Sequence, residues 1–543
     1  MGCARAAFVG RTLRGPVDRA VLITSFAEFQ HAFGGLWQPS PLGYAVEQFF
    51  DNGGREALVV RVVNGARPAS LTLTAGRQAL ELRAVRPGTR EFLRAGVDYD
   101  NVASDLEFNL TVQRVRNPGT EQVEDQEIFP RLAICPTAER FVGAVLARSE
   151  LIRACGSVPT VRPDPTLPSD GGRGAGYVNS NADGDDGAPL TDYDVIGSEQ
   201  HRTGLFALGA DYFNLLCVPP LSRDQDVGAS LLLVAARYCK ERRAMLVVDP
   251  PADWHTAEEA LRGMRQWNFW SDNALLYFPR ILAHDKLRGH FESFAPCGAV
   301  AGMLARSDDA SPALGLGKLE EAVLRPGYRP SCLVGEDKRM RLAALGVNTI
   351  QAVRSAARIG VAPRTLAAGN ATTPDWQSLA ARRLALYILN SIERGTRWAV
   401  SAEPRFGVAE TVAAQVRAFF ERLHEAGAFG DRAPDESFFV ICDGRVGGER
   451  PLTGEGSSEG LGEDSRASDF QLLIGFAAVR RREFHSYRVV HCASGSTVRP
   501  VSLNRLNAVH YSPAELAWVE KLADQLRPAD VVEQTQPRRL RLD

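Results

Sequence analysis

The sequence of 543 residues has almost no lysine, no long hydrophobic run and no excess of positive charge. Its formal net charge is −2, which excludes the basic footprint of a typical nucleic-acid-binding protein. No run of about 18 apolar residues is present, so the sequence predicts no transmembrane helix. Residues 1–6 lack the apolar segment of a signal peptide. Nearly all cationic residues are arginine, which pairs with carboxylates in a bidentate way and suits subunit interfaces.

Closely spaced cysteines are also missing. None of the nine cysteines forms a Cys-x-x-Cys pair, so the sequence predicts no zinc site. Cys217 and Cys442 lie inside apolar runs, which indicates buried, reduced thiols. Reduced thiols are typical of a protein that is assembled in the cytoplasm.

Motifs for catalysis and cofactor binding are absent. The Gly-rich stretches 171–176 and 454–456 lack the Gly-Lys-Ser/Thr of a phosphate-binding loop. The histidines form no metal-binding spacing, and there is no Gly-x-Ser-x-Gly nucleophile elbow. Residues 249–255 place acids and a histidine after a strand, where an α/β enzyme keeps its site. A proline stop before a helix capped by Thr256 is the simpler interpretation, so we expect no enzyme and no catalytic, cofactor or metal site.

The length predicts about three domains. Strands and helices alternate through residues 1–65 and 194–345, which favours an α/β core domain with a mainly parallel sheet. Its helix at 257–266 begins with a capping box of Thr256 and Glu259. The predicted core strands are 6–10, 57–63, 212–218, 244–249 and 274–279.

The pattern changes at residue 66. Residues 66–125 alternate apolar and polar types between Pro-Gly turns, which predicts a β-rich domain inserted in the core. Residues 126–193 predict a helix near 141–146 and then a flexible loop. The loop, 158–193, is rich in Pro, Gly and Asp and has few apolar residues, so we expect it to be poorly ordered.

Residues 346–492 predict an α+β C-terminal domain, followed by a tail over 493–543 with a helical stretch at 513–525. Apolar stripes at helical spacing mark helices at 379–394 and 408–426. Three strands follow, at 438–443, 472–479 and 484–491. The fold class is therefore α/β and multidomain: a mainly parallel core, a β-rich insertion and an α+β C-terminal domain. The sheet residues predicted in the C-terminal domain are Phe438, Val440, Cys442, Leu473, Gly475 and Ala477.

Many segments resemble, in order, the tail sheath family of contractile phages, R-type bacteriocins and phage-tail-like injection systems. The resemblance covers about residues 6–490. Its most specific part is an ordered set near the N-terminus that ends in the strand Val59-Val60-Arg61-Val62. The segments that carry it are 8–12, 15–16, 21–29, 33–35, 40–54, 96–101, 108–112, 213–219, 274–280, 295–302, 346–350, 364–366, 382–384, 391–398, 427–429, 438–443 and 475–477.

The resemblance implies a structural protein, not an enzyme. Such subunits polymerise with copies of themselves as a helical tube around an inner tail tube, and contract to drive it through a target envelope. The implied partners are other copies, the inner tail tube protein, and baseplate and tail terminator proteins, with no nucleic acid and no membrane. Assembly would occur in the bacterial cytoplasm, in a virion tail or a phage-tail-like particle. Two alternatives are a baseplate or cap component of the same machine, and an α/β enzyme.

The resemblance also implies how neighbours are joined. In the family, terminal arms add strands to a neighbour's C-terminal sheet. Members usually carry an extended N-terminal arm, but residues 1–5 alone precede the first strand here, so either the start is truncated or the subunit lacks that arm. We expect 484–491 to be an edge or exchanged strand between subunits, with an ordinary edge strand within the chain as the alternative. Its predicted assembly residues are Phe484, Tyr487, Val489 and Val490.

Overall fold

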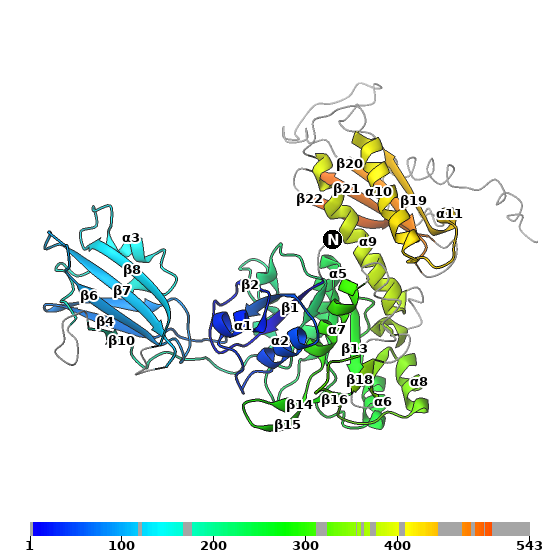
Figure 1. The fold of residues 1–543 in the computed structure, drawn as a ribbon, viewed down its shortest axis with the longest axis horizontal. Helices are drawn as coiled ribbons and strands as arrows, with labels where there is room; N and C mark the ends of the chain where they lie inside the picture. Colours follow the sequence, from blue (N-terminus) through cyan, green and yellow to red (C-terminus); the bar gives the residue numbers. More distant parts are fainter. Residues whose placement is uncertain are drawn as a thin grey trace, which may run out of the picture. The chain divides into compact units, whose positions relative to one another are not determined.

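The computed structural model describes residues 4–117, 122–166, 176–310, 323–353, 356–359, 363–369, 376–400, 408–443, 470–478, 484–492 and 495–501. The chain divides into two compact units, Met1–Arg382 and Arg383–Asp543 (Figure 1). Each unit has its own sheets and its own packing, so they are described separately.

The first unit is built on an eight-stranded sheet in the order β18-β17-β13-β12-β11-β1-β3-β2. Neighbouring strands from β17 to β3 are parallel, as the alternating pattern predicts. The edge strands β2 and β18 are antiparallel, so the sheet is mixed. The strands are β1 (Arg5–Gly10), β2 (Ala20–Ile23), β3 (Glu56–Arg61), β11 (Leu215–Cys217), β12 (Met245–Val248), β13 (Ala274–Phe278), β17 (Val347–Val353) and β18 (Ala356–Ile359).

Helices cover this sheet because its strands are apolar on both faces. Leu231 of α5 (Ala229–Arg242), Leu261 of α6 (Ala257–Gln266) and Leu342 of α8 (Glu336–Ala344) share one buried cluster with alternate strand residues such as Ala7 and Val9. The capping box predicted for α6 is confirmed.

Two further helices, α2 (Leu42–Asp51) and α7 (Cys297–Ala310), pack closely against each other. A Cβ at Gly298 would collide with the carbonyl of Ala45, so glycine permits this approach. Phe49 of α2 meets Phe8 of β1 edge-on, with ring centroids 5.5 Å apart. Beside them lie α1 (Phe26–Phe33) and a three-stranded sheet of β14 (Ile281–Asp285), β15 (His290–Phe294) and β16 (Arg329–Pro330).

Between β3 and β11 the chain forms two antiparallel sheets, and none of their described strands joins the central sheet. We call them the inserted sheets. Their inner faces alternate apolar residues, such as Leu71, Leu73 and Leu80, and share a core of their own. The order is β10-β6-β7-β8 in one sheet and β4-β5-β9 in the other. The elements are β4 (Ser70–Ala75), β5 (Gln78–Ala84), β6 (Leu93–Asp98), β7 (Glu107–Val115), β8 (Val123–Ala133), α3 (Val142–Leu146), β9 (Ile152–Cys155) and β10 (Val178–Asn179).

Residues 158–166 and 176–193 differ from the predicted poorly ordered loop, and 167–175 lie outside the described residues. The described part is held to the inserted sheets by polar contacts. The N–H of Asp164 donates to the carbonyl of Thr74 at 2.7 Å, and the N–H of Thr166 donates to Val97 at 3.0 Å. The segment contributes β10, and it ends in α4 (Asp192–Ile196), whose capping box joins Thr191 and Asp194. Hydrogen bonds replace the apolar burial that the segment lacks.

The predicted start of a C-terminal domain at residue 346 falls inside the central sheet. Val347 of β17 pairs with Leu276 of β13, and it is fully buried. The two compact units are instead divided between Arg382 and Arg383, within α9 (Leu379–Thr396).

The second unit is an antiparallel sheet, β19-β20-β21-β22, packed against helix α10 (Val408–Glu425). The strands are β19 (Phe438–Asp443), β20 (Phe470–Phe476), β21 (His485–Cys492) and β22 (Gly495–Val501), and the short helix α11 (Pro434–Ser437) precedes them. Phe420 of α10 is fully buried and stacks on Phe438 with ring centroids 4.9 Å apart. Of the predicted tail, 495–501 form β22, and the predicted helix at 513–525 lies outside the described residues.

Candidate assembly surfaces

The predicted residues of the C-terminal sheet lie where the strand pattern places them. In the β19–β20 pairing, Phe438 is opposite Phe476, Val440 opposite Ile474, and Cys442 opposite Leu472. Leu473 and Gly475 of β20 face Ile441 and Phe439. Ala477 follows β20, and its N–H donates to the carbonyl of Ser437 at 2.8 Å.

Gly475 is required at its position by close packing. A Cβ there would overlap the ring of Phe439, its cross-strand neighbour. That ring in turn meets Phe484 edge-on, with centroids 5.3 Å apart. Phe484 is the residue before β21. Its contact with Phe439 therefore links the start of β21 to β19.

The predicted assembly strand is not an edge strand in this chain. β21 pairs with β20 on one side and with β22 on the other. Tyr487 lies between Ile474 and Pro500, Val489 between Leu472 and Val498, and Val490 between Gln471 and Thr497. The expected edge position is therefore corrected, and the described edges of this sheet are β19 and β22. Sequence reasoning missed β22 because it contains Gly495 and Pro500, residue types that are depleted in strands but tolerated at an edge.

A buried histidine fixes β21 to its surroundings. The Thr396 hydroxyl donates to the carbonyl of Ile392 at 2.7 Å, so it accepts from Nε2 of His491, also at 2.7 Å. The Ser496 hydroxyl lies 2.7 Å from Nδ1 and donates to it. Burial lowers the pKa of His491, and the positive charge of Arg397 lowers it further. The neutral imidazole thus connects β21 with α9 and β22.

In the segment at 249–255, the alternative enzyme site, Asp249 and His255 make separate contacts. Oδ1 of Asp249 accepts from the N–H of Cys297 at 2.8 Å and so caps the first turn of α7. Burial of the carboxyl group raises the pKa of Asp249 to about 6. His255 is exposed, and its N–H donates to Glu259 in the capping box of α6. The Asp249 side chain and the backbone N–H of His255 therefore belong to two different helix starts.

Over the part of the chain that the structure describes, no group of three His, Cys, Asp or Glu side chains is placed to hold a metal ion. No described helix combines the length and the apolarity needed to cross a membrane.

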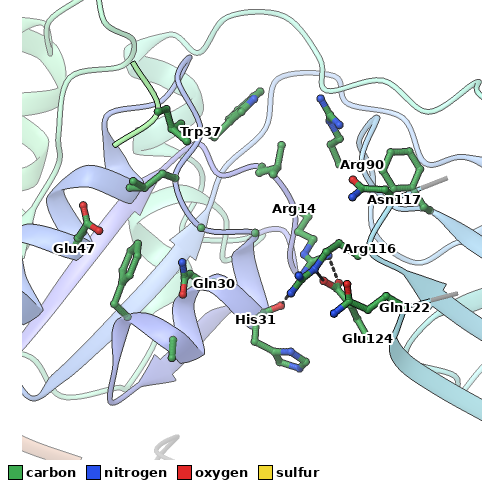
Figure 2. Close-up of a pocket in the computed structure, with 18 of the residues that line it drawn as sticks. Arg14, Gln30, His31, Trp37, Glu47, Arg90, Arg116, Asn117, Gln122 and Glu124 are labelled. Carbon is green, nitrogen blue, oxygen red and sulfur yellow. Dashed lines mark hydrogen bonds and ion pairs between the residues drawn. The ribbon is translucent and has the colours of Figure 1, made fainter. Parts of the chain in front are cut away.

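A large hollow, here called the junction groove, lies between α1 and the adjoining ends of β7 and β8 (Figure 2). Its volume is about 1160 Å³. Arg14 pairs with Glu124 at 2.5 Å across it, and Arg116 pairs with the same carboxylate at 3.3 Å. Lys286 pairs with Glu47 at 2.7 Å. Sequence reasoning missed this groove because Arg14 and Glu124 are 110 positions apart and no local pattern links them.

Buried Arg61 ties the inserted sheets to the core, whereas buried Arg114 has its partners within those sheets. Arg61 of β3 donates to the carbonyls of Gly15 and Pro87 at 2.8 and 2.9 Å. Burial lowers its pKa to about 10. Arg114 of β7 lies 3.6 Å from Asp125 and 3.9 Å from Glu124. Because these charges are shielded from water, removing one partner would leave the other costly to bury.

The comparisons with known proteins give matches in structure alone. No protein-family model matches the chain, and no curated protein sequence does. A sheath tail protein from Listeria innocua is similar over 91% of this chain and 96% of its own, with a TM-score of 0.59 and 13% identity. A sheath tail protein from Desulfitobacterium hafniense is similar over 91% of this chain and 97% of its own, with a TM-score of 0.51 and 12% identity. This chain, over nearly its whole length, therefore has the fold of these two sheath tail proteins.

Proposed function

We propose that the protein is the structural subunit of a contractile tail sheath. Copies polymerise as a helical tube around an inner tail tube, and the tube contracts to drive the inner tube through a target envelope. One observation carries this proposal: the fold matches a sheath tail protein over 91% of this chain and 96% of that one. A fold shared over one domain alone would be much weaker support, because single folds host many functions.

The C-terminal sheet is the proposed site of joining. Its edges, β19 and β22, leave backbone groups that a neighbouring strand can pair with. The β21–β22 hairpin follows residues 479–483, and the same hairpin from a neighbouring copy can pair with β20 in its place. In that exchange Phe484, Tyr487, Val489 and Val490 become inter-subunit residues. Main-chain hydrogen bonds then hold subunits together while they reorient.

Contraction by this mechanism needs no nucleotide and no catalysis. An extended array that is metastable releases energy when its subunits rearrange their surface contacts. The proposed partners are other copies, the inner tube protein, and baseplate and terminator proteins. Assembly takes place in the bacterial cytoplasm, before the particle is used.

The test is to express the chain with and without its candidate tube protein and to examine the products by negative-stain electron microscopy. A sheath subunit gives hollow tubes of regular helical repeat. Single rings or caps of fixed size would favour the baseplate or cap alternative. A protein that forms neither at any concentration would contradict both.

A further inference from the structure

The junction groove carries positive charge that its own carboxylates do not offset. Four cations and two carboxylates line it, for a net formal charge of +2 with His31 neutral. Both carboxylates already have cationic partners. Arg90 is exposed, and no carboxylate of the described residues is paired with it. The groove therefore suits an occupant that brings further carboxylates. The charged residues are Arg14, Arg90, Arg116, Lys286, Glu47 and Glu124.

The groove also has an apolar part beside its charged and polar residues. Phe26 of α1, Trp37 and Val123 line it, and Figure 2 shows Trp37 and Arg90 on different parts of the wall. Val123 is 38% exposed, which leaves apolar area open to a partner. An occupant that fills this site should present an apolar side chain next to its carboxylates.

The turn that joins β6 to β7 has this chemistry. Residues 98–107 read Asp-Tyr-Asp-Asn-Val-Ala-Ser-Asp-Leu-Glu, with four acidic residues and no basic one. The Asp105 side chain is 97% exposed, and its neighbour Leu106 is 50% exposed. Arg162 pairs with Asp105 at 2.9 Å and offsets one of the four charges. The turn stays acidic and has an apolar residue at its surface.

The turn and the groove lie at opposite ends of the same strands. In the β6–β7 pairing, Leu93 faces Arg114 at the groove end, and Asp98 faces Asn109 at the turn end. A six-residue strand spans ~20 Å at ~3.3 Å per residue. Because a paired strand does not fold back on itself, a chain cannot place this turn in its own groove. A 98–107 turn that occupies the groove would therefore belong to another copy.

We propose that residues 98–107 of one copy dock in the junction groove of a second copy. The contact joins two different surfaces, so it is heterologous and repeats along an open-ended array. Asp100 and Asp105 approach the cations of the groove, and Leu106 approaches its apolar wall. The groove and the turn carry this inference by themselves, and only its setting in a sheath rests on the proposed function.

Disulfide trapping tests the contact in the full-length protein. The variant combines Arg90→Cys in the groove and Asp105→Cys in the turn. Both are exposed positions, and Cys135→Ser removes the native thiol next to the turn, where the N–H of Ile134 donates to Leu106. Oxidation should give a series of covalent oligomers on a non-reducing gel, which reductant returns to monomer. The matched control pairs Asp105→Cys with Arg262→Cys, an exposed arginine on α6, and should give no series.

Charge reversal supplies a second readout, measured as the association constant by sedimentation velocity. Arg90→Glu and Asp105→Arg should each weaken self-association about tenfold or more, because like charges then face each other. Both changes in one chain should restore most of it, which a loss of folding would not do.

The docking contact would be overturned if oxidation gave no covalent series although the protein sediments as an oligomer. It would also be overturned if the protein stayed monomeric in every sedimentation experiment. Electron microscopy separates this outcome from failure of the proposed function. Tubes without the covalent series would contradict the contact alone, whereas the covalent series without tubes would contradict the sheath function alone.

Discussion

Phe420→Ala tests whether α10 is the support of the proposed joining sheet. The Phe420 ring is fully buried and stacks on Phe438 at 4.9 Å, with Phe476 and Phe429 at 6.3 and 6.4 Å. Removing a buried Phe side chain together with its ring contacts costs about 3–5 kcal/mol. We expect the free energy of local unfolding of β19 and β20 to fall by about 4 kcal/mol.

Hydrogen exchange of the intact protein measures this change locally. A loss of about 4 kcal/mol corresponds to roughly a thousandfold faster exchange in β19 and β20 where opening limits exchange. Phe419→Ala is the matched control on the same helix, because Phe419 is only half-buried and its ring meets Tyr387 at 6.1 Å. It should speed exchange by no more than about tenfold. Equal effects of the two substitutions, or unchanged exchange in β19 and β20, would refute the reasoning.

Three further predictions follow from other parts of the molecule. The pKa of Asp249 is raised to about 6 in the folded state from 3.8, so the wild type loses stability as its carboxyl group ionises with rising pH. The Asp249→Asn variant has no such group and should gain up to ~3 kcal/mol relative to the wild type between pH 4 and 7. A difference in the free energy of urea unfolding between the two proteins that stays constant from pH 4 to 7 would contradict this. Deletion of 484–543 should abolish tubes seen by electron microscopy, and normal tubes from the truncated subunit would exclude strand exchange. Arg14→Ala and Glu124→Ala should each lower the thermal unfolding temperature, with a coupling energy of about 0.5–3 kcal/mol in a double-mutant cycle, since both side chains are largely buried. Strictly additive effects would mean that the pair does not couple the inserted sheets to the core.

The strands of the central sheet could be predicted because each has a recognisable local sequence pattern. Residues 57–63 and 274–279 are continuous apolar runs, and burial on both faces of a parallel sheet requires such runs. β17 was assigned to another domain because the sequence of 347–353 does not say which neighbour it pairs with. Its pairing with β13 depends on contacts about 70 residues away.

The segment at 158–193 shows a second limit. Its low apolar content predicts disorder, yet Asp183 accepts from the hydroxyl and N–H of Ser70, and Asp186 does the same with Thr89. These partners are about 100 residues away in the sequence, so composition could not reveal them. The junction groove escaped prediction for the same reason, because the ion pair of Arg14 with Glu124 exists only once the inserted sheets have folded.

The chain leaves the core and returns to it at one place. Arg67 and Asp185 exchange two backbone hydrogen bonds, each of 2.9 Å, and the N–H of Ala188 donates to Asn64. The described residues between them form the inserted sheets and their connections, with a core of their own. Because the two ends of the insertion lie next to each other, the inserted sheets can be replaced without changing the path of the chain through the central sheet. A short turn would be enough to join the two ends. A foreign domain with adjacent termini could therefore be grafted between Arg67 and Asp185 for display on each subunit, although this would also remove the residues of the proposed docking contact.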